Sequence, residues 1–336
     1  MKKRILASLL CATMLIMAGC GSSDASGDAA GATSTAGADS DKYTVGICQL
    51  VQHPALDLAT EGFQDALHDK LGDTVVFDVQ NASGDSANCG TIVNGFVSGQ
   101  YDLIMANATP ALQAAVSGTT TIPVVGTSVT DYGVALDIDS DAWTGTTGIN
   151  ATGVSDLAPL DQQAQMIKDL FPDAKTVGIL FCSAEANSKY QDKVMTEELG
   201  KLGYTVKSYT FSDTNDVATV TQTACADSDV IYIPTDNTAA NCAELIGGIV
   251  VPAGVPVFAG EEGICKSCGV ATLTISYYDV GYQAGEMAYE ILANKADPST
   301  MEIKYVPDVE KKYNPTVAEQ LGIEIPSDYI AIEDGE

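Results

Sequence analysis

Apolar segments alternate with amphipathic segments along the first half of the chain. We expect strands where apolar or β-branched residues run together, and helices where apolar residues recur every three or four positions. The expected strands cover 43–50, 74–79, 101–106 and 122–125, and the expected helices between them cover 55–71, 86–97 and 111–116. Strands that alternate with helices form parallel sheets, so this half is expected to be a doubly wound α/β unit with four parallel strands.

A second series of the same kind begins after Asp156. It repeats the architecture of the first series without an obvious sequence repeat. Helices are expected at 157–170, 188–202, 216–225, 239–250 and 280–292, strands at 176–181, 205–210, 230–233, 255–258 and 270–275, and closing segments at 303–306 and 316–321. The fold class is therefore predicted to be α/β, with two doubly wound, Rossmann-like lobes and a ligand cleft between them.

The loops that follow the expected strands are consistently polar. In doubly wound sheets, ligands bind beyond the carboxyl ends of the strands. The loops at these ends comprise residues 49–54, 107–110, 126–131, 183–188, 234–238 and 260–262. We therefore look for the functional site among these loops.

The start of the chain differs in composition from the rest. Basic residues at 2–4 precede an apolar stretch at 5–18, which at about 14 residues is too short to span a bilayer, so residues 1–19 are predicted to be a signal peptide. Small residues stand directly before Cys20, as in a bacterial lipobox, and we expect lipid attachment there; the alternative is an ordinary signal peptide with an incidental Cys20. Residues 20–41 are rich in Gly, Ser, Ala, Thr and Asp and predict a flexible linker.

Composition narrows the class of function. The region after residue 41 contains 336 − 41 = 295 residues, more than one core usually holds, which favours two lobes. The net charge of −29 argues against binding to nucleic acid and is typical of a solvated acidic surface. The chain has only two His and lacks the nucleophile-elbow, zinc-protease, Walker and dinucleotide motifs. We therefore expect a binding protein without a cofactor rather than an enzyme.

Seven of the nine cysteines follow Cys20, and an odd number cannot pair completely. Cys265 and Cys268 form a CxxC sequence, but no second pair and no nearby His complete a metal site. No metal is therefore expected, and the two thiols are either a local disulfide or two free loop cysteines.

Several loop residues suit the charged groups of a small ligand. Thr109 before Pro110 combines a hydroxyl with free backbone amides at a helix start, which suits a carboxylate, although plain helix capping is the alternative. Asp236 and Glu261 each suit a ligand ammonium; the alternatives are an N-cap for Asp236 and a solvated turn for Glu261. His53 can hydrogen-bond a ligand or satisfy its own loop.

The same loops resemble one known family, the tryptophan- and tyrosine-binding solute-binding lipoproteins of ABC importers, which have the type I periplasmic-binding-protein fold. The resemblance extends from about residue 45 to residue 292. It rests on residues 49–57, 108–110, 122–125, 129–131, 152–156, 185–188, 234–238 and 277–281.

The resemblance implies two lobes joined by three hinge crossovers, near Ser155, Tyr277 and Ala296, with the ligand between the lobes. The N-terminal lobe would comprise residues 42–155 with 277–296, and the C-terminal lobe residues 156–276 with 297–330.

For an amino-acid ligand, the resemblance also implies a role for each candidate residue. The carboxylate would be held by Thr109, Ser128 and Thr130. The ammonium would be held by Asp236 or Glu261, with added hydrogen bonds from Asn187 and Asn237. The side-chain pocket would include Tyr132 and the loop from Gln49 to His53. Departures from the family pattern are Cys48, Cys182 and Gly126, and the last two border the expected cleft.

The resulting hypothesis is an extracytoplasmic, lipid-anchored, monomeric binding protein that delivers an amino acid to an ABC permease and its ATPase. The amino acid is expected to be aromatic: tryptophan, tyrosine or phenylalanine. One alternative is a sensor or adhesin that uses the same cleft without transport. Another is an extracellular enzyme of doubly wound fold.

Overall fold

The computed structural model describes residues 42–333. The expected signal peptide at 1–19, the lipidation site Cys20 and the linker at 20–41 lie outside these residues. Two sheets organise the described chain, and we call each sheet with its helices a lobe.

The first lobe is built on a six-stranded sheet with the order β11-β5-β4-β3-β1-β2, in which every strand pair is parallel. Its strands are β1 (Tyr43–Gln49), β2 (Val75–Asn81), β3 (Leu103–Asn107), β4 (Val124–Val129), β5 (Ala151–Ser155) and β11 (Lys304–Tyr305). Its helices are α1 (Pro54–Leu71), α2 (Ser86–Ser98), α3 (Thr109–Gly118), α4 (Tyr132–Ala135) and α11 (Tyr277–Asn294). The expected doubly wound half is confirmed, with six strands where four were expected.

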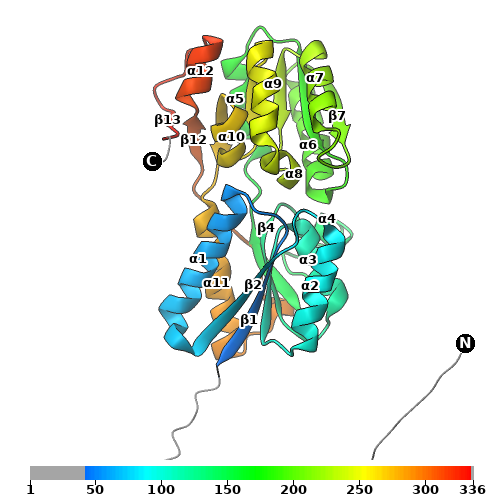
Figure 1. Cartoon of the computed structure of the whole chain (residues 1–336), viewed down its shortest axis with the longest axis vertical. Coiled ribbons are helices and arrows are strands. Elements are labelled where there is room, and N and C mark those ends of the chain that lie inside the picture. The colour runs from blue at the N-terminus through cyan, green and yellow to red at the C-terminus, as the bar shows by residue number, and fades with distance from the viewer. Residues whose placement is uncertain (1–41, 334–336) are drawn as a thin grey trace, which may run out of the picture. The chain divides into compact units, whose positions relative to one another are not determined.

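Alternate side chains of the central strands enter two cores on opposite faces of this sheet. Along β3, Leu103 and Met105 pack with residues of α1 and α11, whereas Ile104 and Ala106 pack with residues of α2 and α3. Figure 1 shows α1 and α11 together on one face and α2 and α3 together on the other. All of β3 is buried, as a central parallel strand covered on both faces requires.

Helices α1 and α11 cross closely because glycines face backbone there. A Cβ atom on Gly281 would lie 2.0 Å from the carbonyl oxygen of Ala59, and one on Gly62 would lie 2.1 Å from that of Tyr278. Only glycine allows this approach. The contact holds α11 in the first lobe, although the chain reaches it after most of the second lobe.

The second lobe is built on a seven-stranded sheet with the order β13-β12-β10-β9-β8-β6-β7. Its strands are β6 (Thr176–Cys182), β7 (Thr205–Phe211), β8 (Val230–Ile233), β9 (Val257–Ala259), β10 (Ala271–Thr274), β12 (Glu310–Tyr313) and β13 (Ile330–Ala331). Its helices are α5 (Leu160–Leu170), α6 (Ala186–Lys201), α7 (Val217–Asp227), α8 (Asn237–Asn241), α9 (Ala243–Ala253), α10 (Glu262–Cys268) and α12 (Pro315–Leu321). Its strand pairs are parallel except β10 with β12.

Some elements of the second lobe differ from the expected ones. The helix expected at 239–250 is divided into α8 and α9, which meet at Cys242. The pair β12 and β13 was not expected. β12 has the sequence Glu-Lys-Lys-Tyr, and its residues are exposed or half-buried. A strand without apolar alternation gives no hydrophobic signal.

The third crossover lies later in the chain than expected. Strand β11 pairs with β5, and Ile303 is buried in the first lobe, so residues 297–305 belong to the first lobe and not to the second. The hydroxyl of Thr152 donates to the carbonyl of Met301 at 3.2 Å, which holds this segment against β5. The crossover therefore falls between Tyr305 and β12, and the expectation of a crossover near Ala296 was wrong.

Within residues 42–333, none of the helices combines the length and apolar character that a membrane crossing requires. The same residues contain no group of three or more His, Cys, Asp or Glu arranged to hold a metal ion. Cys265 and Cys268 are free thiols buried in α10, so they form neither the local disulfide nor the loop pair that was expected.

Candidate functional site

Strand ends from both lobes surround a small inner cavity. Its volume is about 10 Å³, close to the minimum that a single water requires. The inner cavity is lined by His53, Leu56, Ser128, Asp156, Thr235, Asp236, Asn237, Ala240, Glu261 and Tyr277. Half of the candidate residues from the sequence are thus together at this point: His53, Ser128, Asp236, Asn237 and Glu261.

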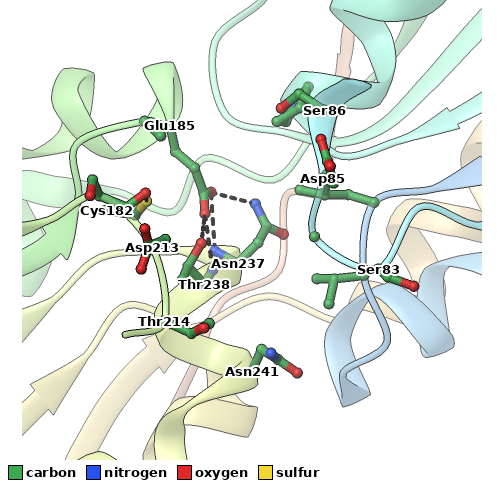
Figure 2. Close-up of a pocket in the computed structure, with 16 residues that line it drawn as sticks. Ser83, Asp85, Ser86, Cys182, Glu185, Asp213, Thr214, Asn237, Thr238 and Asn241 are labelled. Atoms are coloured by element: carbon green, nitrogen blue, oxygen red, sulfur yellow. Dashed lines mark hydrogen bonds between the residues drawn. The ribbon is translucent and has the colours of Figure 1, made fainter. Parts of the chain in front are cut away.

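A larger outer cavity of about 210 Å³ lies between the loops of the two lobes (Figure 2). From the first lobe it is lined by Leu50, Val51, Ser83, Gly84, Asp85, Ser86 and Pro110. From the second lobe it is lined by Cys182, Ala184, Glu185, Ser212, Asp213, Thr214, Asn237, Thr238 and Asn241. Asn237 lines both cavities, so they are neighbours.

His53 and Asn237 connect the two lobes. Burial lowers the pKa of His53, so its imidazole is neutral at pH 7. The side-chain nitrogen of Asn237 donates to Oε2 of Glu185 at 2.7 Å, which turns Oδ1 of Asn237 towards Nε2 of His53 at 3.2 Å. An amide oxygen only accepts, so Nε2 carries the proton and Nδ1 is an acceptor. This Nδ1 atom is buried without a partner.

Thr130 makes a second connection between the lobes. Its hydroxyl lies 3.4 Å from the hydroxyl of Thr235, which follows β8. The side-chain nitrogen of Gln191 on α6 donates to Thr235 at 2.7 Å and to Thr130 at 3.5 Å. The loops after β4 and β8 are therefore joined through hydroxyl and amide groups.

The backbone is unusual at two of the loops in the first lobe. Ala108, before α3, has φ of 92°, and Ser128, at the end of β4, has φ of 54°. The pairing of β4 with β5 also shifts register between Gly126 and Val129. Non-glycine residues in this region cost roughly 1–3 kcal/mol and are frequent at functional sites. The hydroxyl of Ser128 is buried without a hydrogen-bond partner.

Both carboxylate oxygens of Asp236 accept hydrogen bonds from residues of the second lobe. Its Oδ1 accepts from the backbone N–H of Ala239 at 2.7 Å, and its Oδ2 accepts from the N–H of Cys182 at 2.6 Å and the hydroxyl of Ser188 at 2.7 Å. Burial raises the pKa of Asp236 to about 7, and the nearby Glu185 contributes in the same direction. Asp236 is thus the N-cap of α8, as in the alternative to an ammonium-binding role that the sequence left open.

Glu261 and Glu185 are also occupied by helix N-termini. Glu261 caps α10 by accepting from the N–H groups of Gly263 and Ile264, at 2.6 and 2.5 Å, so it is a buried cap and not a solvated turn. Burial raises its pKa to about 7. Glu185 accepts from the backbone and side chain of Asn237 and of Thr238, as the dashed lines in Figure 2 show.

Asp156 is the exception among the buried carboxyl groups, and the sequence did not single it out as a site residue. It directly follows β5, at the first crossover. Its Oδ2 accepts from the hydroxyl of Tyr277 at 2.9 Å, and its Oδ1 is buried without a partner. Burial raises its pKa to about 6, although Tyr277 and Thr130 act against this. Two features of the sequence could have identified Asp156 as a site residue. It is an acidic residue directly after a strand, and it lies in a segment that resembles the family.

These buried carboxyl groups have no cationic partner in the described part of the chain. No ion pair there involves Asp156, Glu185, Asp236 or Glu261. Lys312 pairs with Glu262 at 2.8 Å, next to Glu261, and with Glu310. Buried acidic groups without a counter-ion create a site of negative potential, which favours a positively charged ligand group.

The other candidate residues do not line the inner cavity. Gln49 hydrogen-bonds Val51, Asp57 and Thr60 within the first lobe. The ring of Tyr132 is packed in the core of the first lobe, and its hydroxyl lies 3.3 Å from the carbonyl of Val154.

Thr109 and Asn187 lie beside the two cavities without lining either. Thr109 is buried at the start of α3, directly before Pro110 of the outer cavity. Asn187 donates to the carbonyl of Thr235 at 3.0 Å, and its own Oδ1 is buried without a partner.

This chain is similar to known proteins of one family. The sequence profile of the family described as ABC transporter substrate binding protein matches residues 44–334. The tyrosine-binding protein of Clostridioides difficile (strain R20291) is 34% identical over 305 residues, which cover 88% of this chain and 86% of that protein.

Two solved structures are also similar. The ABC domain of Streptococcus pneumoniae in complex with L-Trp has 30% identity and a TM-score of 0.82, and the match covers 86% of this chain and 99% of that one. A ligand-free, open substrate-binding protein with adhesive properties from Clostridium difficile has 33% identity and a TM-score of 0.66, covering 87% of this chain and 99% of that one.

These similarities confirm the expected type I periplasmic-binding-protein fold. The family profile spans nearly all the described residues, and relatives with more than 30% identity cover most of the chain. The chain therefore belongs to the family of ABC transporter substrate-binding proteins.

Proposed function

We propose that this protein binds an aromatic amino acid between its two lobes and delivers it to an ABC permease and its ATPase. The observation that carries the proposal is the inner cavity, where buried carboxyl groups have no cationic partner among the described residues and where Nδ1 of His53, Oγ of Ser128 and Oδ1 of Asp156 are unpaired. Unpaired buried polar atoms are rare because each costs about 1–3 kcal/mol. A zwitterionic ligand would satisfy all three.

The carboxylate of the ligand is proposed to bind the loops of the first lobe. The hydroxyl of Ser128 has no hydrogen-bond partner. Helix α3 begins at Thr109, and the first N–H groups of a helix have no partner within the helix. The N-terminus of a helix favours an anion through these amides and through the helix dipole. Thr130, Asn187 and Asn237 would add hydrogen bonds from the facing loops.

The aromatic ring is proposed to occupy the outer cavity. Leu50, Val51 and Pro110 give this cavity an apolar wall, whereas Glu185, Asn237 and other residues give it a polar one. A ring with a polar group, such as indole or phenol, suits a pocket of this mixed character. The names of the relatives support the choice, since one is a tyrosine-binding protein and another was solved with L-Trp.

Binding is proposed to involve opening and closing of the lobes. With a volume of about 10 Å³, the inner cavity admits an amino acid only when the lobes separate. His53 to Asn237 and Thr130 to Thr235 are direct contacts across the cleft, as expected for a closed arrangement. The lower TM-score with the open relative is consistent with this interpretation. The ligand would stabilise the closed state through contacts with both lobes.

As a member of its family the protein is extracytoplasmic and binds a solute, and the family is not one of enzymes. We further propose that the lipid on Cys20 and the 20–41 linker tether it as a monomer beside its permease. Replacing Cys20 by Ala should release the protein from the membrane fraction, and retention of that variant in the membrane would contradict the proposed anchor.

A second candidate function is adhesion. It is favoured by one relative, 33% identical, which is a substrate-binding protein with adhesive properties.

Calorimetry of the purified protein with each of the twenty amino acids tests the main proposal. We expect stoichiometric binding of one or more of L-tryptophan, L-tyrosine and L-phenylalanine. Binding of a sugar or nucleoside, with no heat from any amino acid, would contradict it.

A further inference from the structure

We propose that Asp156 accepts the primary ammonium group of the ligand and that Tyr277 positions Asp156 for this role. The inference rests on the amino-acid ligand proposed above. It differs from the prediction from sequence, which assigned the ammonium to Asp236 or Glu261.

The hydrogen-bonding capacity of the four buried carboxyl groups favours Asp156. Both oxygens of Glu185 and of Glu261 accept bonds from N-terminal groups of α8 and of α10, respectively. Asp236 accepts from the N–H of Ala239 in α8 through Oδ1, and from the N–H of Cys182 and the hydroxyl of Ser188 through Oδ2. If one of these groups turned to a ligand, it would leave backbone N–H groups unpaired. Oδ1 of Asp156 has no partner to lose. A charge-assisted bond from an ammonium is therefore gained at Asp156 without the loss of another bond.

The unpaired atoms at the inner cavity have the hydrogen-bonding capacity that the charged groups of an α-amino acid require. Nδ1 of His53 and Oδ1 of Asp156 are acceptors at the inner cavity, so they suit the several N–H donors of an ammonium. Oγ of Ser128 can donate, which suits a carboxylate. The N–H of Asp156 donates to the carbonyl of Val129 at 3.3 Å, so Asp156 and Ser128 lie on loops that are bonded together. An α-amino acid carries both charged groups on one carbon and requires such adjacent partners.

Asp156 and Tyr277 also lie where the chain passes between the lobes. Asp156 follows β5 at the first crossover, and Tyr277 begins α11 at the second. The hydroxyl of Tyr277 donates to Oδ2 of Asp156 at 2.9 Å and thereby leaves Oδ1 for the cavity. An ammonium bound at Oδ1 would contact the hinge itself, so its binding would be coupled directly to closure.

The test compares an amino acid with its analogue that lacks the amine. Calorimetry would measure the affinities of wild type and Asp156→Asn for L-tryptophan and for 3-(indol-3-yl)propionate, with L-tyrosine and 3-(4-hydroxyphenyl)propionate as a second pair. For wild type we expect a strong preference for the amino acid. Asp156→Asn should reduce that preference roughly tenfold to a hundredfold, since a charge-assisted bond is lost. Tyr277→Phe should reduce it by a smaller factor.

Asp236→Asn and Glu261→Gln are the matched controls. If they only support helix starts, they should weaken the binding of both ligands of a pair equally and leave the preference unchanged. A preference that is unchanged in Asp156→Asn, or that is lost in a control instead, would overturn the assignment while leaving the proposed function intact. If wild type bound no amino acid at all, the proposed function and this inference would both be wrong.

Folding of the variant can be checked independently. Asp156→Asn removes a buried charge and keeps the side-chain shape, so thermal unfolding should occur at or above the wild-type temperature. If the variant does not fold, Asp156→Ser gives the same comparison with a smaller side chain, and Asp156→Glu should retain the preference for the amine.

Discussion

Nε2 of His53 lies 3.2 Å from Oδ1 of Asn237, and this contact joins loops that are 184 positions apart in the sequence and belong to different lobes. One partner stands directly before α1, and the other begins α8. The contact forms only when the lobes are together, so it reports on closure as well as on the ligand site.

We expect the contact between His53 and Asn237 to stabilise the closed, ligand-bound state. His53→Ala and Asn237→Ala should each weaken binding of the aromatic amino acid about tenfold, because each removes a hydrogen bond across the cleft. In a double-mutant cycle measured by calorimetry, the two substitutions should show a coupling energy of about 0.5–3 kcal/mol. His68→Ala, on the exposed side of α1, is the control and should bind as wild type does. Additive effects at His53 and Asn237 would show that the contact does not contribute to binding.

Substitution of Ser128 should affect ligand affinity without lowering the stability of the fold. Its buried hydroxyl has no partner, so Ser128→Ala should leave the free energy of unfolding unchanged or raise it by up to about 1 kcal/mol. Ligand affinity should fall about tenfold if this hydroxyl donates to the carboxylate. Urea unfolding and calorimetry give the two values.

The control for Ser128 is Ser188, which is also buried but is hydrogen-bonded to Asp236 at 2.7 Å. Ser188→Ala leaves a buried carboxylate with one bond fewer, so it should lower the free energy of unfolding by about 1–3 kcal/mol. If Ser128→Ala destabilised the protein as much as Ser188→Ala, its hydroxyl would have a structural role instead.

The sequence predicted the α/β architecture because strands buried on both faces, such as β3, are continuous apolar runs that stand between segments of helical periodicity. It did not predict β12, whose sequence Glu-Lys-Lys-Tyr is mostly charged and whose residues are exposed or half-buried. The third crossover was misplaced because the pairing of β11 with β5 is a long-range contact between short strands. Local pattern carries no information about such a pairing.

Candidate residues were chosen by their position after strands, which identifies the edge of the sheet but not the direction of a side chain. His53 and Asn237 therefore lie at the inner cavity as expected, whereas the side chain of Gln49 turns towards Thr60 of α1. Asp156 was not chosen as a candidate site residue, because a crossover was expected at its neighbour Ser155. Its unpaired oxygen becomes evident only when the bonds of all four buried carboxyl groups are compared.

Gly281 should be essential for the packing of α1 against α11. A Cβ atom there would lie 2.0 Å from the carbonyl oxygen of Ala59, so Gly281→Ala must push the helices apart and should lower the free energy of unfolding by about 1–3 kcal/mol or more. Gly248→Ala in α9 is the control, because a Cβ atom there meets nothing within 4 Å. That substitution should raise the free energy by about 0.5–1 kcal/mol. Equal stability of the two variants in urea would contradict the close crossing.

The buried carboxyl groups should make the ligand-free protein less stable at neutral pH than at pH 5. Burial raises the pKa of Asp156 to about 6 and those of Asp236 and Glu261 to about 7, from ordinary values of 3.8 and 4.5. Between the ordinary and the raised pKa, the folded chain binds more protons than the unfolded chain, so the free energy of unfolding falls as pH rises from about 4 to about 7.

The contribution of Asp156 can be isolated by comparing wild type with Asp156→Asn in urea at pH 4, 5, 6 and 7. A titrating group contributes up to about 1.4 kcal/mol per pH unit to the slope of the free energy of unfolding against pH. The variant should lack the part of this slope that Asp156 contributes. Its stability curve should therefore be flatter than that of wild type between pH 4 and pH 6. An ammonium bound at Asp156 would favour the charged carboxylate, so the aromatic amino acid should stabilise wild type more at pH 7 than at pH 5. Parallel stability curves for the two proteins, with ligand stabilisation independent of pH, would indicate that Asp156 does not titrate in the folded protein.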